Sequence, residues 1–141
     1  MAQMIKQVIY SRSTQEITAV DDGGEILGSW ECRDDFVEGY NDEGLPRESL
    51  PNGIYDEIDA EVYYPGEQPQ MYGTFYITTG DYRGRDIHGG GSGLSDPYAP
   101  YQGWVPTWGC LRMQNADGEE LSDLIIEANG AGLTVNLIVG D

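Results

Sequence analysis

One histidine and two cysteines are the side chains of this sequence best suited to nucleophilic chemistry. The histidine is His88, and the cysteines are Cys32 and Cys110. An ordinary thiol has a pKa of about 8.5 and is only slightly ionised at neutral pH, so a nucleophilic cysteine needs a neighbouring base. Taken singly, a lone histidine or cysteine is more often structural than catalytic. Together, Cys110 and His88 could carry out acyl transfer, with Cys110 as nucleophile and His88 as base.

Glycines accompany both of these residues. Gly89 follows His88, and Gly109 directly precedes Cys110. A glycine before a thiol allows another segment of chain to approach and leaves backbone amides free to face a substrate oxygen. We therefore expect the N–H groups of Gly109 and Cys110 to form an oxyanion hole.

The segment around Cys110 is similar to a known family signature. Residues 107–113 read Thr-Trp-Gly-Cys-Leu-Arg-Met, and His88-Gly89 precedes them after a long connection. The L,D-transpeptidase catalytic domain, often called the YkuD type, has a histidine and glycine, a loop, then Ser or Thr, any residue or His, Gly, Cys, an aliphatic residue, and Arg or Asn. Residues 50–55, Leu-Pro-Asn-Gly-Ile-Tyr, also resemble the family's Thr-Pro-x-Gly-x-Tyr segment. The chain resembles this family over nearly its whole length.

The resemblance implies an L,D-transpeptidase-like cysteine enzyme that acts on peptidoglycan stem peptides through a thioacyl intermediate. In this interpretation Cys110 attacks the carbonyl, His88 moves the proton, and the backbone carbonyl of Gly89 orients the imidazole. The resemblance also places four side chains against the substrate: Tyr72, Thr107, Trp108 and Arg112.

Trp108 is the main departure from the family pattern, because most members have a second histidine at this place. Two alternatives follow. One is a hydrolytic L,D-carboxypeptidase or peptidoglycan-cleaving toxin on the same scaffold, and the other is a degenerate domain that binds wall peptides or another protein without turnover. Trp108, Trp104 and Tyr101 could line a cleft for the peptide, although aromatic residues in a β-rich domain are more often core.

Acidic residues dominate the charge of the chain. Asp and Glu number 25 against 7 Lys and Arg, which gives a net charge of −18. This charge repels phosphate backbones and anionic bilayers, so it excludes a nucleic-acid partner and argues against membrane docking. It also disfavours a lone thiolate and favours imidazolium, so we expect a close Cys110 thiolate and His88 imidazolium pair. Arg112 would support that thiolate, bind a substrate carboxylate, or form a surface salt bridge.

No cofactor or metal site is expected. Two cysteines and one histidine do not make a metal-binding cluster. The acidic segment 33–53 could coordinate a cation or receive an amine, but it lacks the spacing of a calcium loop, which favours a solvated loop.

Strand signals fill most of the remaining sequence. Twenty glycines and seven prolines, set among short runs of Val, Ile, Tyr and Thr, predict many turns between many strands. The expected strands cover residues 7–11, 16–20, 25–32, 54–64, 71–79 and 133–139, with hairpin turns at 21–24 and 65–69. The alternation in 25–32 places Ile26, Trp30 and Cys32 on one face, with Cys32 in the core. Residues 89–106 form a loop long enough to suggest a functional role.

One helix is predicted after the cysteine motif. Leu121, Leu124, Ile125 and Ala128 repeat with helical spacing, acidic residues occupy the first turn, and Asn129-Gly130 follows, so the expected helix covers residues 117–128. The predicted fold class is therefore mostly β, a sandwich or barrel-like sheet with one helix, which is also the fold that the resemblance implies.

The length of 141 residues predicts one domain, 1–141, with a core that needs no disulfide. The first 20 residues hold no apolar run of signal-peptide type, and no stretch is long and apolar enough to insert into a membrane. The resemblance implies action at the cell wall or in the periplasm. The export route therefore stays open between a trimmed signal, an effector and a phage-encoded protein.

Overall fold

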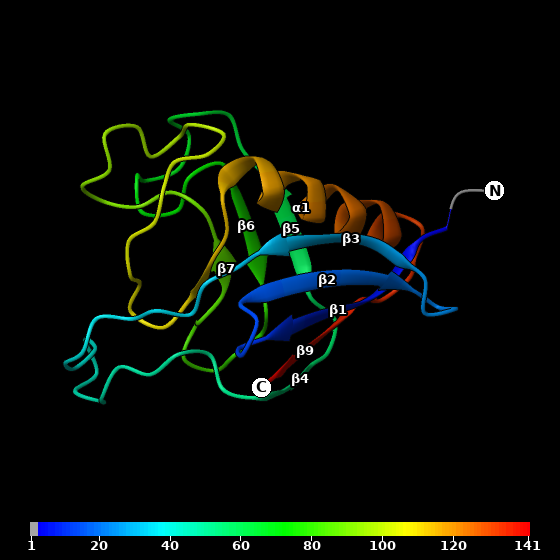
Figure 1. Cartoon of the computed structure of the whole chain (residues 1–141), viewed down its shortest axis with the longest axis horizontal. Helices are drawn as coiled ribbons and strands as arrows, with labels where there is room; N and C mark the ends of the chain where they lie inside the picture. Colours follow the sequence, from blue (N-terminus) through cyan, green and yellow to red (C-terminus); the bar gives the residue numbers. More distant parts are fainter. Residues whose placement is uncertain (1–2) are drawn as a thin grey trace.

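The computed structural model describes residues 3–141 and contains two β-sheets with one helix lying across them (Figure 1). The first sheet has the strand order β3-β2-β1-β9-β4. Its strands are β1 (Ile5–Ser11), β2 (Glu16–Asp21), β3 (Ile26–Glu31), β4 (Gly53–Tyr55) and β9 (Asn136–Gly140). The second sheet has the order β5-β6-β7-β8. Its strands are β5 (Asp59–Val62), β6 (Phe75–Thr78), β7 (Ile87–His88) and β8 (Leu111–Arg112). This architecture confirms the predicted mostly-β class.

The first three strands form consecutive antiparallel hairpins, and the turn predicted at residues 21–24 joins the second strand to the third. In the second turn, the Asp21 carboxylate accepts the N–H groups of Gly23 and Glu25, both at 2.9 Å, and Gly24 has a φ of +84°. A short acceptor side chain and a glycine in the left-handed region are what such a turn requires.

The alternation predicted for the third strand is wrong at Ile26. Cys32 is fully buried, as predicted, but Ile26 is 67% exposed. Ala19 pairs with Gly28 whereas Val20 pairs with Ile26, so one extra residue, Leu27, is inserted into β3. This irregularity turns Leu27 toward the core and Ile26 toward solvent, because each added residue reverses the faces of a strand.

The extended run predicted over residues 54–64 is two strands in different sheets. β4 pairs with β9 in the first sheet, and β5 pairs with β6 in the second. The chain turns between them at Glu57, whose φ is +56°, and Ile58 is buried beside the break. The predicted hairpin around residues 65–69 is present between β5 and β6.

Helix α1 (Asn115–Gly130) packs mainly against β5 and β6 and fills the space between the sheets. Leu121, Ile125 and Ala128 are fully buried, which confirms the predicted apolar face. Gly118 of α1 lies so close to Phe75 of β6 that a Cβ at this position would overlap the ring.

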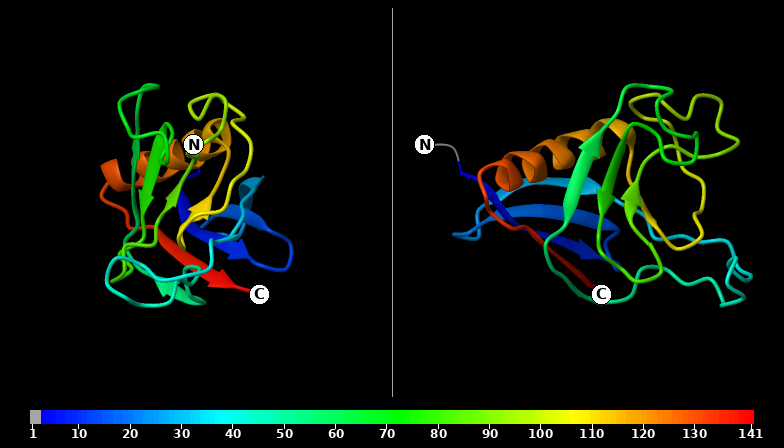
Figure 2. Two further views of the ribbon diagram at one scale, coloured as in Figure 1. Left: turned by 90° about the vertical axis from the view of Figure 1, so that its left-hand side faces the viewer. Right: turned by 180° about the vertical axis from the view of Figure 1, so that it is seen from behind.

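Three long connections leave the sheets at one end of the molecule. They cover residues 32–52, 63–74 and 89–110, and they lie together at the left of Figure 1 and at the right of the rear view in Figure 2. The short strands β7 and β8 deliver His88 and Arg112 to this end.

Candidate active site

The pairing of β7 with β8 brings the predicted chemical residues together. These strands are parallel, with Ile87 opposite Leu111 and His88 opposite Arg112. Ile87 and Leu111 are fully buried. Because side chains alternate along a strand, His88 and Arg112 point to the opposite face. Cys110, directly before Leu111, shares that face.

A pocket of about 670 Å³ opens on this face and holds both predicted catalytic side chains. Its lining residues are Val37, Asp42, Met71, Tyr72, His88, Ser92, Val105, Pro106, Thr107, Trp108, Cys110 and Arg112. Of the residues predicted from the sequence, the structure therefore places Cys110, His88, Arg112, Trp108, Thr107 and Tyr72 around one cavity.

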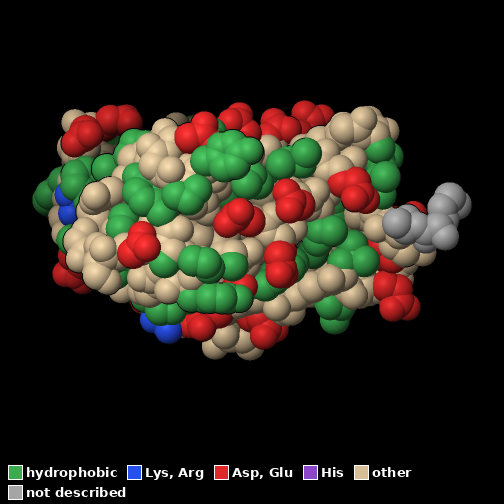
Figure 3. All heavy atoms as spheres, turned by 90° about the horizontal axis from the view of Figure 1, so that it is seen from above, with side chains coloured by type: hydrophobic (Ala, Val, Ile, Leu, Met, Phe, Trp, Pro, Cys, Tyr) green, Lys and Arg blue, Asp and Glu red, His purple; other side chains and the backbone are tan. Residues whose placement is uncertain are grey.

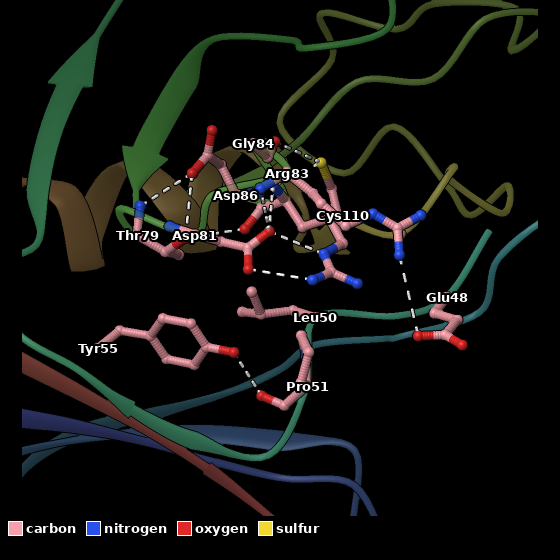
Figure 4. A network of polar contacts seen from close by, with 12 residues as sticks. Glu48, Leu50, Pro51, Tyr55, Thr79, Asp81, Arg83, Gly84, Asp86 and Cys110 are labelled. Carbon is pink, nitrogen blue, oxygen red and sulfur yellow. Dashed lines mark hydrogen bonds and ion pairs between the residues drawn. The ribbon is translucent and has the colours of Figure 1, made fainter. Parts of the chain in front are cut away.

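The Cys110 thiol is held by the turn that precedes β7 (Figure 4). Its Sγ accepts the backbone N–H of Asp86 at 3.3 Å and lies 3.9 Å from the carbonyl oxygen of Gly84. Among residues 3–141 no hydrogen bond joins this sulfur to His88. Burial raises the pKa of Cys110 to about 11; the Asp86 N–H opposes this rise, the Asp86 carboxylate adds to it, and Arg112 lowers it.

The His88 imidazole is fixed by the carbonyl next to it. Nδ1 lies 3.0 Å from the carbonyl oxygen of Gly89, so the contact that the resemblance implies is present. A carbonyl only accepts, so we assign the proton to Nδ1, which leaves Nε2 of the neutral ring as the basic nitrogen. The ring packs edge-on against Tyr72, with centroids 5.1 Å apart, and is stacked on Tyr76 at 5.9 Å.

The predicted thiolate and imidazolium pair is wrong for the protein without substrate. Burial lowers the pKa of His88 to about 4, against the opposing effect of the Gly89 carbonyl. The pKa values of about 11 for Cys110 and about 4 for His88 differ by about 7. A thiol pKa above the imidazole pKa favours the neutral pair over the ion pair. Burial outweighs the net charge of the chain, so both groups are neutral at pH 7.

The loop before the thiol offers one free amide rather than two. The N–H of Gly109 donates to the Thr107 hydroxyl at 3.0 Å, and that hydroxyl donates to the Cys110 carbonyl at 2.7 Å. The Thr107 hydroxyl thus links the Gly109 N–H to the Cys110 carbonyl and holds the conformation of this loop. In the described part of the chain, the Cys110 N–H has no acceptor. Of the two amides predicted for an oxyanion hole, the Gly109 N–H is therefore already engaged by Thr107.

Gly109 is required by a close approach of chain, as predicted. Its φ is +139°, and a Cβ there would overlap the carbonyl oxygen of Glu48 and lie 3.0 Å from Cδ of Arg85. The Leu50 N–H donates to the Gly109 carbonyl at 2.9 Å. Residues 48–50 therefore pack directly on the segment that carries the thiol.

Arg112 is buried, and the surface salt bridge considered for it is absent. The guanidinium donates to four backbone carbonyls, which belong to Met71, Gly89, Val105 and Pro106. Its charge has no acidic partner among the described residues, and it lies near enough to lower the pKa of the Cys110 thiol. The guanidinium also ties Gly89, which holds the imidazole, to residues 105–106 on the other wall of the pocket.

Trp108 lines the mouth of the pocket and remains half exposed. The guanidinium of Arg47 lies 3.5 Å from its ring centre, which is a close cation–π contact. Arg47 belongs to the acidic loop, and Val37 and Asp42 of the same loop line the pocket. The loop predicted to be merely solvated therefore forms one wall of the site.

Two aromatic residues considered for the cleft lie elsewhere. Tyr101 is 70% exposed and does not line the pocket. Trp104 lies under the guanidinium of Arg33, at 4.2 Å, and is also absent from the pocket lining.

The buried polar groups behind the pocket were not predicted from the sequence. Asp81 and Arg85 form a buried ion pair with Nε···Oδ2 at 2.8 Å, and Tyr76 donates to Asp86 at 2.6 Å. The only sequence signal for Asp86 is that it lies two residues before His88 and so faces the same side of the strand. Nothing in the local pattern indicates the Asp81–Arg85 pair.

Most of the arginines form ion pairs with acidic side chains of the same chain, and the excess of Asp and Glu leaves the surface acidic. Ion pairs join Arg12 to Asp34, Arg33 to Glu31, Arg83 to Glu48 and Arg85 to Asp81. Figure 3 shows acidic side chains spread over the face that carries α1. Among residues 3–141 no group of three or more His, Cys, Asp or Glu could hold a metal ion, and no helix could cross a membrane.

The fold is similar to that of solved L,D-transpeptidase structures. The chain is similar over 98% of its length to an L,D-transpeptidase from Xylanimonas cellulosilytica, with a TM-score of 0.59 and 18% identity. An L,D-transpeptidase from Stackebrandtia nassauensis matches 98% of the chain with a TM-score of 0.60 and 16% identity. The helical cell shape determining protein Pgp2 from Campylobacter jejuni matches 97% with a TM-score of 0.61 and 14% identity.

These likenesses concern the fold. The chain spans 61%, 56% and 47% of those three solved chains, respectively. No family model matches the sequence, and no curated protein matches it. The predicted resemblance to the L,D-transpeptidase fold is thus confirmed by structure at a low level of sequence identity.

Proposed function

We propose that this protein is a cysteine enzyme of the L,D-transpeptidase kind, acting on peptidoglycan stem peptides at the cell wall or in the periplasm. The observation that carries the proposal is the pocket in which Cys110 and His88 face the same cavity while the Gly89 carbonyl holds His88 Nδ1. The fold is that of proteins with this activity. The roles of Cys110, His88 and Gly89 belong to the proposal.

In the proposed first half-reaction, the Cys110 sulfur attacks the carbonyl before a terminal D-alanine. Its proton passes to Nε2 of His88 as the S–C bond forms, because both groups start neutral. The carbonyl oxygen becomes an oxyanion that accepts the Cys110 N–H. The C–N bond then breaks, the imidazolium gives its proton to the leaving amine, and D-alanine departs from a thioester.

In the second half-reaction, an amine or a water molecule attacks the thioester carbonyl. Neutral His88 takes a proton from the attacking group and returns it to the departing sulfur. An amine gives a cross-link or an exchanged stem, and water gives a shortened stem. The low pKa of His88 makes its imidazolium a strong acid toward the leaving group, and substrate binding must bring Nε2 and the sulfur into hydrogen-bond contact.

The test is incubation of the protein with tetrapeptide and pentapeptide muropeptides, followed by mass spectrometry of the products. Dimers or D-amino-acid-exchanged stems support transfer, and trimmed monomers without dimers support the hydrolytic alternative. Cys110→Ala should abolish every product. Cys32→Ala is the matched control, because Cys32 is fully buried away from the pocket, and it should keep the activity.

The binding-module alternative also has an observation in its favour, since the Cys110 thiol has a raised pKa and no hydrogen bond to His88 among the described residues. A carbapenem separates the two interpretations, because it acylates only a competent nucleophile. Covalent labelling of Cys110, lost in His88→Gln, supports the enzyme. A folded protein that binds stem peptide but forms neither adduct nor product would be a binding module.

A further inference from the structure

Asp86 contacts the Cys110 sulfur directly and is linked to the His88 ring through Tyr76. Its backbone N–H donates to the Cys110 sulfur at 3.3 Å. Its carboxylate oxygen Oδ2 accepts the Tyr76 hydroxyl at 2.6 Å, and Oδ1 accepts the Thr79 N–H at 2.9 Å. Figure 4 shows Asp86 between the turn at residues 79–84 and the thiol.

Tyr76, whose hydroxyl donates to Asp86, also packs against the His88 imidazole. It stands opposite His88 in the pairing of β6 with β7, and the two rings are stacked with an interplanar angle of 15°. Tyr72 closes against both rings at nearly right angles. A hydroxyl anchored on Asp86 therefore fixes the ring that covers one face of His88.

Asp86 is a buried carboxylate whose partners are neutral donors. Its exposed fraction is 6%, and among the described residues no Lys or Arg pairs with it. The adjacent Arg85 turns instead to Asp81, with Nε and Nη2 at 2.8 and 3.1 Å from its carboxylate. A buried charge without a counter-ion is costly, so a fold that keeps one beside a thiol needs a reason for it.

We propose that Asp86 is a positioning residue for both members of the pair, holding the Cys110 sulfur through its backbone N–H and the His88 ring through Tyr76. This inference rests on the proposed function only in treating the pair as catalytic. Asp86 acts through its neighbours, and it touches neither the reacting carbonyl nor the leaving group.

The position of the carboxylate also affects ionisation of the thiol. The charged and titratable groups that influence Cys110 or share its pocket are Asp86, Asp81, Arg112, His88, Asp42, Tyr72 and Tyr76. The negative charge of Asp86 raises the pKa of the thiol, and its N–H lowers it. Asp86→Asn separates the two effects, because Asn keeps the backbone N–H and an oxygen for Thr79, while the Tyr76 hydroxyl can turn to accept from the new amide.

The experiment measures alkylation of Cys110 by iodoacetamide between pH 6 and 11, with peptide mass spectrometry to identify the modified cysteine. Asp86→Asn should shift the midpoint downward by about one pH unit, so alkylation near pH 8 becomes about tenfold faster. Asp123→Asn removes one charge from an exposed site on α1 and should leave the midpoint unchanged. Because Asn retains the contacts that position the pair, this shift reports the charge of Asp86 alone, and the positioning role is decided by the titration of His88.

The second readout is the titration of His88 by NMR, which is direct because the chain has one histidine. Asp86→Ala frees Tyr76, so the His88 pKa should rise toward its ordinary value, while Asp86→Asn should keep it low. This rescue by the conservative variant is not expected of a residue that only stabilises the fold. Equal His88 titration in Asp86→Ala and the wild type would contradict the proposal. If Asp86→Ala does not fold, Tyr76→Phe decides, because it removes the hydroxyl that Asp86 holds and keeps the ring beside His88; an unchanged His88 titration in Tyr76→Phe would overturn the proposal.

Neither readout requires turnover. If muropeptides give no product while Asp86→Ala raises the His88 pKa as expected, the proposed function fails and the positioning role stands. If products form and His88 titrates in Asp86→Ala as in the wild type, the positioning role fails alone.

Discussion

The two sheets are stabilised in different ways. The first sheet presents apolar, fully buried side chains to the interior, namely Val8, Tyr10, Ile17, Ala19 and Leu137. In the second sheet β7 and β8 have two residues each, and their pocket side is polar. That side is supported by the buried Asp81–Arg85 pair and by the hydrogen bonds of Asp86. The second sheet also buries Phe75, Ile77, Ile87 and Leu111 on its other face, so the difference lies in its pocket side, which depends on a few directional contacts.

Breaking the buried ion pair should give the largest loss of stability. Asp81→Ala leaves the Arg85 guanidinium buried without its partner and removes the acceptor for the N–H groups of Arg83 and Arg85. We expect a loss of about 3–5 kcal/mol in the free energy of unfolding, measured by urea denaturation. Glu31→Ala breaks an exposed pair with Arg33 and should cost less than about 1 kcal/mol. Equal effects of the two substitutions would contradict the comparison between the sheets.

The next largest effect should appear as the pH falls. The folded pKa of His88, about 4, lies below the unfolded value of about 6.5, so the unfolded chain takes up the proton first. Stability is therefore lost between pH 6.5 and 4, by about 3 kcal/mol for this group. The wild type should lose that much more than His88→Gln over the same interval. An NMR titration midpoint of His88 at or above 6.5 would exclude the effect.

A smaller effect is expected where the second sheet meets the helix. Gly118→Ala places a methyl group against the Phe75 ring and should destabilise the protein by about 1–3 kcal/mol, seen as a lower melting temperature. Gly130→Ala is the matched control in the same helix, because nothing lies within 4 Å of a Cβ there. It should be neutral or slightly stabilising. A neutral Gly118→Ala would show that Phe75 can move aside.

The elements that local patterns specify were predictable from the sequence. The hairpins of β1 to β3 and the helix α1 have turn residues and apolar spacing that act within a few residues. Ile26 and the 54–64 run were predicted wrongly, since an inserted residue in β3 and a turn at Glu57 have no clear local signature. The inserted residue and the turn at Glu57 are set by the pairing of β3 with β2, of β4 with β9 and of β5 with β6, and these partners are distant in the sequence or outside the local pattern.

The candidate site likewise has some features with a local sequence signature and others without one. The residues around Cys110 and His88 carry a recognisable pattern, and the structure brings them to one pocket. Their protonation states were not predictable, because they depend on burial. Burial lowers the pKa of His88 and raises that of Cys110, and it is the largest cause of both shifts. Asp86 and Tyr76 were missed for a related reason, since their contact joins β6 to the turn before β7.

The parallel register of β7 and β8 has a consequence for how this protein can change over evolution. Pairing of Ile87 with Leu111 is enough to set the thiol and the imidazole on one side of the sheet, and the connection between them contributes no strand to that pairing. Lengthening such a connection costs little free energy, whereas a shift of one residue in the register would turn Cys110 into the core. The mostly exposed residues 92–96 can therefore be rebuilt for new substrates, whereas the two-residue strands and the carbonyls of Gly89, Val105 and Pro106 that hold His88 and Arg112 cannot.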